Sequence, residues 1–498
     1  MRPEDIQNEL GNIGSDLIER ANAPKSYKSN TRRRVGWVPL VAACLALVIL
    51  LGVLLMPTRG PISALPSGRL PLTGTTQNGL EPTPTPVDPF LLLAPTYPAC
   101  VMYPAKNNNS TFQEWRNAQE AKQRQFRSAQ VDMNDFFIST MQEMLTETNG
   151  ENGFYSPINI YVALSMIAEM SEGESREQLL ALLGEESVSE LRQKIRALWE
   201  SHYTNDGMSK LLLANSLWFD NTFTPKDDTM QLLADYYYAS TFRGDMQDPV
   251  LHQSMSNWIS EQTDGFMNIP ADELKPSPET VFKMISTIYF EAEWSEPFYS
   301  NHTVKDTFYT SDVSVKCEFM NGSRYMYYYR GEGFSAVALP MNGQGFMWFV
   351  LPDEGIALSE LLKNGEFCEF IQNPTDWENK VHATVHLSVP KFDISCDSDL
   401  VNMMKKLGVE DIFSETEADF SPIGDGPIYV QRLDHTARCK IEESGCKAAA
   451  VTSGEFALES VPPELEFDFI LNRPFYFQIT STHGTPLFAG VINDPTLE

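Results

Sequence analysis

The sequence contains few cysteines, few histidines and few basic residues, and each shortage excludes a class of protein. Its seven cysteines are dispersed without a CxxC or similarly close spacing, which indicates mostly free thiols in place of a disulfide framework. Lys and Arg number 37 against 67 Asp and Glu, so the formal net charge is -30. Because nucleic acids and anionic membrane surfaces repel an acidic body, we expect no nucleic-acid partner.

Hydrolase and metal-site motifs are also missing. There is no GxSxG, and His435 follows an Asp but has no partnered serine motif. His382 and His386 stand four residues apart, so on a strand both would face the same side. Without a nearby Cys or a third ligand, this pair indicates a structural role more than a metal site. We therefore predict no catalytic residue, no metal and no cofactor, with an enzyme of unrecognised site as an alternative.

One long apolar run lies near the N-terminus. Residues 35–56 carry no charge and are long enough to span a bilayer, and the basic run Arg32–Arg34 precedes them. This order favours a cytoplasmic segment over residues 1–34 and an exported C-terminal part. The rivals are a cleaved signal peptide and a lipoprotein with a lipidated Cys44, but the apolar run continues to Met56. We predict an uncleaved single-pass anchor in the cell membrane, with the remaining chain on its extracellular face.

The remaining chain divides in two by composition. Residues 57–111 are rich in Pro, Thr, Gly and Ser and cannot bury a core, which predicts a tether containing a small apolar island at Phe90–Leu93. We expect residues 112–498 to be globular. Short β-type runs at residues 345–352 and 475–480 are mixed with helical stretches without a βαβ rhythm. This pattern predicts an α+β domain with large mixed or antiparallel sheets.

Residues 442–464 form an unusual stretch, rich in small side chains and closed by two prolines. Between residues 446 and 456, its odd positions carry the charges, at Lys447 and Glu455. On a strand, its uncharged even positions would form one face fit for burial. Taken alone, the stretch suits a flexible surface loop, but its composition also allows it to enter a sheet. These even positions are Cys446, Ala448, Ala450, Thr452, Gly454 and Phe456.

This stretch resembles the hinge and loop of the serpins, a family of serine protease inhibitors. Glu443-Ser444-Gly445 followed by Ala448, Ala449 and Ala450 is similar to the serpin hinge, and Val461–Glu464 to the segment that returns the loop to the body. Further motifs follow in family order over residues 130–498. They include Phe154–Ile158, Ala214–Trp218, Asn257–Ile259, Ile288–Phe290, Pro390–Phe392, Leu407-Gly408, Ala418–Ser421, Arg473–Phe475 and Phe488–Gly490.

The resemblance implies a serpin fold with large mixed sheets, surrounding helices and an exposed reactive-centre loop. It implies a scissile bond between Glu459 and Ser460, a covalent acyl complex with a target serine protease, and insertion of the cut loop into the main sheet. If the protease cuts one bond earlier, Leu458 becomes the specificity residue, and elastase-like, chymotrypsin-like or cysteine proteases become the targets. A non-inhibitory binding protein with a serpin fold is the further alternative. We expect the protein to be a monomer and a membrane-tethered, bacterial-type member of this family.

The resemblance also assigns structural roles around the main sheet. It implies that Glu443, Gly445, Cys446, Ala448, Ala449 and Ala450 form the hinge. Trp294 is expected at the breach, where loop insertion starts, and His435 with Ser156 at the shutter beneath the sheet. Asn159 and Ser286 stand where the family commonly has Ser and Asn, so a rewired set of hydrogen bonds is expected there.

Overall fold

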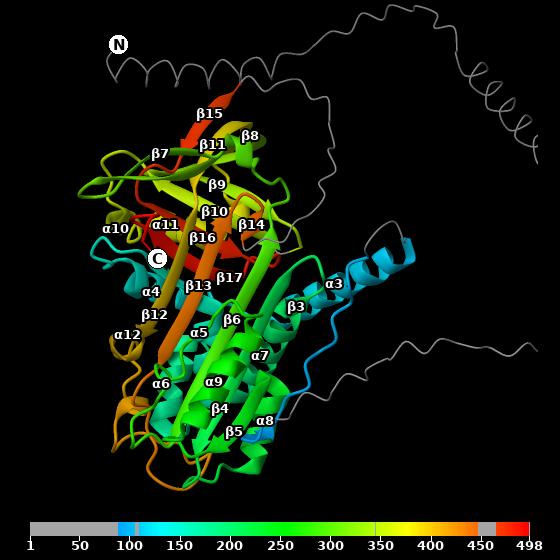
Figure 1. The fold of residues 1–498 in the computed structure, drawn as a ribbon, viewed down its shortest axis with the longest axis vertical. Coiled ribbons are helices and arrows are strands. Elements are labelled where there is room, and N and C mark those ends of the chain that lie inside the picture. Colours follow the sequence, from blue (N-terminus) through cyan, green and yellow to red (C-terminus); the bar gives the residue numbers. More distant parts are fainter. Residues whose placement is uncertain (1–87, 105–108, 344, 447–464, 498) are drawn as a thin grey trace, which may run out of the picture. The chain divides into compact units, whose positions relative to one another are not determined.

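The computed structural model describes residues 88–104, 109–343, 345–446 and 465–497, all within one compact unit. Helices surround two β-sheets in this part of the chain (Figure 1). The α+β architecture expected from the sequence is therefore confirmed. The β-type runs at residues 345–352 and 475–480 form β10 and β16, two neighbouring strands of one sheet.

The main sheet has eight strands in the described residues and contains the hinge. Its order is β1-β5-β4-β6-β14-β13-β12, with β3 paired to β4. Most neighbouring strands are antiparallel, whereas β4 and β5 are parallel, so the sheet is mixed. In that order the bounds are β1 (Leu91–Leu93), β5 (Ala239–Gly244), β4 (Lys210–Asp220), β6 (Phe282–Glu293), β14 (Gly445–Cys446), β13 (Asp434–Glu442), β12 (Phe392–Asp399) and β3 (Thr204–Asn205).

The second sheet has nine strands in the described residues, in the order β15-β11-β8-β9-β10-β16-β17-β2, with β7 paired to β8. The bounds are β15 (Glu466–Ile470), β11 (Lys380–Pro390), β8 (Ser314–Gly331), β9 (Phe334–Met341), β10 (Gly345–Pro352), β16 (Phe475–Thr480), β17 (Pro486–Ile492), β2 (Gly153–Tyr155) and β7 (Val304–Tyr309). Strands β15, β16 and β17 all follow the hinge in sequence, so the two sides of residues 447–464 belong to different sheets.

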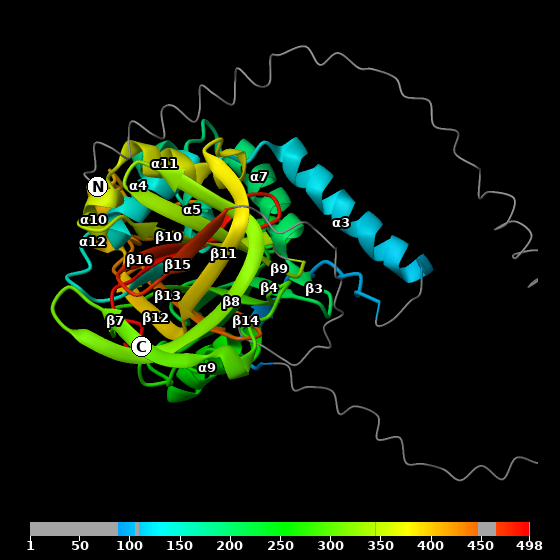
Figure 2. The same cartoon turned by 90° about the horizontal axis from the view of Figure 1, so that it is seen from above.

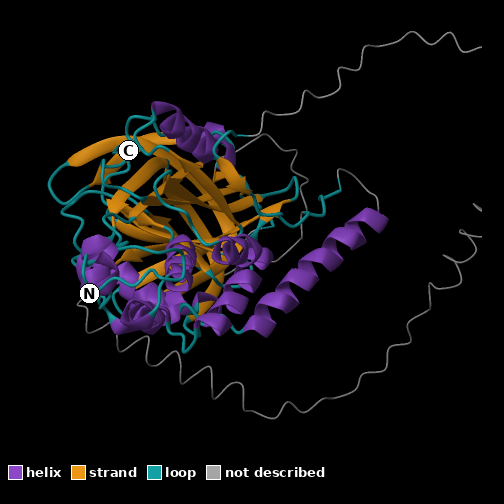
Figure 3. Cartoon of the chain, turned by 90° about the horizontal axis from the view of Figure 1, so that it is seen from below, coloured by secondary structure: helices purple, strands orange, loops and turns teal. Residues whose placement is uncertain are grey.

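The helices gather mainly along one side of the sheets (Figure 3). They are α3 (Asn109–Ala129), α4 (Asn134–Leu145), α5 (Pro157–Met170), α6 (Gly173–Leu183), α7 (Val188–His202), α8 (Asp227–Tyr237), α9 (Pro249–Gln262), α10 (Leu358–Leu361), α11 (Gly365–Gln372) and α12 (Val401–Lys406). Short 3₁₀ turns lie at Ser300–His302, Pro374–Asp376 and Asp411–Phe413.

Helix α5 lies at the centre of the domain. Every one of its residues is buried, as expected for a helix that is apolar on all sides. It starts sharply because Ser156 caps it by accepting a hydrogen bond from the Asn159 N–H, and Pro157 occupies its first turn. The helix therefore holds the shutter residues Ser156 and Asn159 directly beneath the main sheet.

The two faces of the main sheet are packed by different helices. On β4, alternate side chains point to opposite faces, so Leu213 and Leu217 join the large core that contains α5. Ala214 and Trp218 point the other way and pack with Trp258 of α9 in a separate cluster. Helix α9 therefore covers the face of the sheet opposite α5 (Figure 2).

The chain before α3 attaches to the domain at the edge of the main sheet. The apolar island predicted at Phe90–Leu93 includes β1, which pairs antiparallel with β5. Further along, the Tyr97 ring stacks on Trp199 and Tyr203, with ring centroids 5.5 Å away in each case. The predicted division of the chain into residues 1–34, 35–56, 57–111 and 112–498 stays a prediction.

The predicted location in a cell membrane needs correction. In the part of the chain that the structure describes, no helix is both long and apolar enough to cross a bilayer. The longest described helix, α3, has 21 residues but carries many charged and polar side chains along its length, with the sequence NSTFQEWRNAQEAKQRQFRSA. The single-pass protein with an extracellular domain is therefore not supported, and the apolar run at residues 35–56 lies outside the described residues.

Candidate functional site: the hinge and the opening of the main sheet

The hinge enters the main sheet as the short strand β14. Gly445 pairs with Glu293 of β6 on one side and with Glu442 of β13 on the other. Cys446 pairs in the same way with Ala292 and Ile441. Figure 1 shows β13 and β6 side by side, with β14 near one end of both. The two residues of β14 therefore lie as a short strand between β6 and β13.

Between β14 and the first residues of β6 and β13, these two strands form no ladder with each other in the described residues. Both run antiparallel to β14 and hence parallel to one another. The facing edges of β6 and β13 thus present backbone groups that a longer antiparallel strand could pair with.

Gly445 fits a position where the backbones approach closely. A Cβ atom added there would lie 2.4 Å from the carbonyl oxygen of Ala292 and 2.6 Å from the Glu293 Cα. These contacts are with backbone atoms, which cannot rotate away as a flexible side chain can. Glycine is therefore required for the hinge to sit at this depth in the sheet.

A charged pair holds Glu443, two residues before the hinge strand. The Glu443 carboxylate accepts a hydrogen bond from Thr303 Oγ1 at 2.7 Å and lies 3.3 Å from Lys391 Nζ. Burial raises the pKa of Glu443, but the bonds from Thr303 and Lys391 outweigh burial and keep the pKa below its usual value. Glu443 is therefore ionised at neutral pH. It links the hinge to Lys391, which directly precedes β12, and to Thr303, which directly precedes β7.

Trp294, predicted to lie at the breach, is fully buried beside the hinge. Its indole N–H donates a hydrogen bond to the Glu442 carbonyl at 2.9 Å, and its backbone N–H donates to the Ser444 carbonyl at 3.0 Å. The Phe298 N–H binds the Glu443 carbonyl at 2.8 Å. Three consecutive carbonyls before β14 are thus held by one short segment after β6.

His435 and Ser156 contact one another beneath the sheet. The buried His435 ring accepts a hydrogen bond at Nε2 from the Ser156 backbone N–H, 3.0 Å away. Burial lowers the pKa of His435 to about 4, so the ring is neutral at neutral pH. The Ser156 hydroxyl donates to the Leu487 carbonyl at 2.7 Å. These bonds join β13, the start of α5 and β17.

Asn159 and Ser286, the two residues exchanged relative to the common serpin pattern, form a second contact beneath the sheet, between α5 and β6. Ser286 Oγ lies 2.6 Å from Asn159 Oδ1 and 2.8 Å from Asn215 Oδ1. A hydroxyl carries a single proton, so it can donate to only one of the two oxygens at a time. Asn215 of β4 is a third member that the sequence did not single out; its signal is a polar residue within the apolar run LLLANSLWF.

The remaining predicted residues fall into two groups. Ala448, Ala449, Ala450, Leu458, Glu459 and Ser460 lie outside the described residues. His382 and His386 both lie on β11, where His382 packs edge-on against Tyr325 and Tyr327. His386 Nδ1 lies 2.8 Å from Ser323 Oγ. No cluster of three or more His, Cys, Asp or Glu in the described residues is placed to hold a metal ion.

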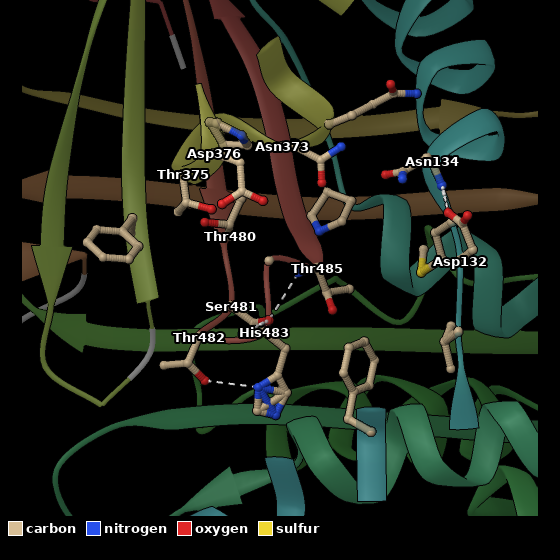
Figure 4. Close-up of a pocket in the computed structure, with 18 of the residues that line it drawn as sticks. Asp132, Asn134, Asn373, Thr375, Asp376, Thr480, Ser481, Thr482, His483 and Thr485 are labelled. Carbon is tan, nitrogen blue, oxygen red and sulfur yellow. Dashed lines mark hydrogen bonds between the residues drawn. The ribbon is translucent and has the colours of Figure 1, made fainter. Parts of the chain in front are cut away.

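A separate cavity of about 570 Å³ opens between the start of α4, the end of α11 and the turn that joins β16 to β17. Figure 4 shows Asp376, Thr480 and Thr485 around this space. Thr485 is buried, and in the described part of the chain its Oγ1 and the Nε2 of His483 have no hydrogen-bond partner. No local pattern in the sequence marks this cavity, because its walls come from four distant segments.

Comparisons with known proteins agree with this geometry. The model of the family described as Serpin (serine protease inhibitor) matches residues 131–495. Serpin-ZX of Arabidopsis thaliana is 29% identical over 372 residues, covering 70% of this chain and 94% of that protein. Alpha-1-antiproteinase of Mus saxicola is 28% identical over 380 residues, covering 74% and 89%.

Solved structures show the same fold. The thermophilic serpin tengpin in its native state has a TM-score of 0.65 and 28% identity, over 73% of this chain and 93% of tengpin. Human thyroxine-binding globulin complexed with thyroxine has a TM-score of 0.66 and 23% identity, over 75% and 100%. Since the family model covers most of the described domain, the chain belongs to the serpin family.

Proposed function

We propose that this chain is a suicide-substrate inhibitor of a serine protease, with its scissile bond between Glu459 and Ser460. Serpins are generally protease inhibitors without catalytic activity of their own, and the hinge geometry supports this role here. In the proposed mechanism the protease attacks the carbonyl carbon of Glu459 and forms an acyl-enzyme, releasing the segment that starts at Ser460. The cut loop then enters the main sheet and carries the protease with it.

The observation that carries the proposal is the seating of Gly445 and Cys446 between β6 and β13. Continuing this register residue by residue would bring Phe456 opposite Phe282, the first residue of β6. Ser453 would reach Asp434, the first residue of β13. The opening therefore matches in length the stretch that resembles an inserting strand.

The side chains of the loop also suit this register. Cys446 packs in the large core, so residues at the even positions after it would face the core as well. These positions are all uncharged, and all are small apart from the bulky Phe456 at the far end. Thr452 would lie opposite both Ser286 and His435, where its hydroxyl could join the polar groups beneath the sheet.

The residue before the scissile bond defines the class of target. A protease pocket that accepts Glu459 must supply positive charge, because a buried unpaired carboxylate is costly. We therefore propose a protease that accepts Glu or Asp. With cleavage one bond earlier, Leu458 would direct the inhibitor to elastase-like, chymotrypsin-like or cysteine proteases.

The test is incubation of the full chain with a glutamyl endopeptidase and, separately, with an elastase, followed by SDS gel and intact mass. We expect a covalent adduct that survives SDS and a released fragment that starts at Ser460. A fragment starting at Glu459 would move the specificity to Leu458. Complete cleavage without an adduct would overturn the inhibitory mechanism.

A second candidate function, non-inhibitory binding of a small molecule, is favoured by the cavity beside Thr485. Its volume of about 570 Å³ suits a small molecule, and its two unpartnered polar atoms could bind one. The test uses thyroxine as a probe, because one protein of the same fold was solved with it. Saturable binding that Thr485→Trp abolishes, together with no protease adduct, would favour this function; absence of binding with adduct formation would favour the first.

A further inference from the structure

Two cysteines meet where the hinge enters the main sheet. Cys446 of β14 and Cys439 of β13 are both buried, 4% and 3% exposed, and their Sγ atoms lie 3.9 Å apart. Cys446 is paired with Ile441, so Cys439 lies two residues along the neighbouring strand with its side chain on the same face. Both are free thiols in the structure.

The surroundings of the two sulfurs allow them to move together. They line a small hollow, too small for a water molecule, beside Phe290, Ile479 and Phe488. A disulfide requires an S–S distance of about 2.05 Å and Cβ atoms about 4 Å apart, whereas diagonal neighbours on adjacent strands lie about 7–8 Å apart, so closure needs the hinge strand to shift towards Cys439 as the sulfurs approach. The hinge strand that carries Cys446 is only two residues long, so its backbone can open and shift more readily than that of a longer strand.

We propose that Cys439 and Cys446 form a redox site at which a small-molecule disulfide cross-links the hinge to β13. Cys446 reacts first, because opening of a two-residue strand exposes it while Cys439 stays within the nine-residue β13. Its thiolate attacks one sulfur of the small disulfide, forming a mixed disulfide and releasing one thiolate. Cys439 then attacks the Cys446 sulfur and releases the second thiolate. The two cysteine protons pass to the leaving groups, so one disulfide is reduced to two thiols as the cysteine pair is oxidised.

The cross-link would fix one end of the loop without blocking its insertion. In the register continued from β14, Cys446 keeps its place between Ala292 and Ile441. The oxidised hinge therefore cannot leave the sheet, yet the residues after it could still pair with β6 and β13. This consequence for the loop rests on the proposed inhibitory function, whereas formation of the cross-link does not.

The test treats the full chain with oxidised glutathione, alkylates the remaining thiols and digests with trypsin. Cleavage after Arg438, Lys440 and Lys447 would release Cys439–Lys440 and Ile441–Lys447 as one disulfide-linked product. We expect this product, an intact mass lower by two hydrogen atoms, and amide exchange at Cys446 slowed by about tenfold. Dithiothreitol should reverse all three changes.

Matched variants distinguish this pair from the other thiols. Cys396→Ala, which removes a partly buried thiol from β12, should leave the linked product unchanged. Cys439→Ala should abolish it and leave a glutathione adduct on Cys446. An unmodified wild-type pair, a stable glutathione adduct on wild-type Cys446, or linkage of either cysteine to another partner would overturn the proposal. Protease adducts measured in parallel test the inhibitory function separately.

Discussion

Gly445 is the residue at which the backbone of the hinge approaches β6 most closely, since a Cβ atom there would lie 2.4 Å from the Ala292 carbonyl oxygen. We predict that Gly445→Ala displaces β14 from the sheet and speeds amide exchange at Cys446 by about tenfold or more. Hydrogen-exchange mass spectrometry measures this change. Gly365→Ala is the matched control, because an added Cβ there meets no atom within 4 Å. Unchanged exchange in the Gly445→Ala protein would contradict the close approach.

Because His435 is buried, we predict that the free energy of unfolding depends on pH. Its pKa is lowered from 6.5 to about 4 by burial, so the unfolded chain binds a proton more readily than the folded one. The free energy of unfolding is therefore highest above pH 6.5, where His435 is neutral in both states. It falls by about 3 kcal/mol as the pH falls towards 4. His202, whose pKa burial lowers to about 3, adds a second contribution of the same sign.

Urea unfolding at pH 7.5 and pH 5 checks this prediction. We expect His435→Gln to be less stable than the wild type at pH 7.5, because its contact with Ser156 changes, but to lose less stability between the two pH values. His302→Gln, at an exposed position, should behave like the wild type. An equal loss in the His435→Gln and wild-type proteins would show that His435 does not titrate in this range.

The residues of the site could be predicted only in part. The resemblance singled out Trp294, His435 and Ser156, and the structure brings these side chains to the hinge and the sheet opening. The contact of Glu443 with Lys391 was missed, because 52 residues separate the two and only pairing of distant strands brings them together. Side-chain contacts of this kind depend on the tertiary fold and leave little local pattern in the sequence.

At the scale of secondary-structure elements, Thr452 provides a test of loop insertion. In the proposed register it faces the core opposite Ser286 and His435, so Thr452→Arg would force a charge beneath the sheet. We predict that the protease still cuts this variant at the same bond but forms less than about one tenth of the wild-type adduct. Densitometry of SDS gels measures the ratio of adduct to cleaved chain.

The neighbouring Ser453 supplies the control for that test. Its side chain would face away from the core, so Ser453→Arg should retain adduct formation close to that of the wild type. If both arginine variants inhibit equally, the proposed register is wrong. If both fail, the loss reflects charge in the loop and not the face on which it lies.

The strands differ in how far their sequences predicted them. β10 and β16 are runs of apolar and aromatic residues, and their predicted bounds agree with the structure. β14 could not be placed from local pattern, because Gly and Ala are poor strand formers. Its strand conformation depends on the two strands that pair with it. β6 lies far away in the sequence, and β13 precedes β14 across a turn.

At the scale of the whole molecule, insertion of the loop would complete the main sheet. A strand between β6 and β13 would pair the backbone groups that face each other there and bury the even-numbered side chains. We predict that the chain cleaved between Glu459 and Ser460 unfolds at a temperature higher by about 10 °C or more than the intact chain. Differential scanning calorimetry before and after cleavage, with the cut confirmed by mass, measures the shift. A cleaved chain that melts at or below the temperature of the intact one would contradict insertion.

The attachment of β1 to the edge of the main sheet has a mechanical consequence. A force applied to the chain before Asp88 reaches the domain first through β1 and its short ladder with β5. The opening between β6 and β13 lies three strands further in, beyond β5, β4 and β6. Tension would therefore peel β1 from the edge, and then pull Tyr97 from Trp199 and Tyr203, before it acts on the strands that border the opening.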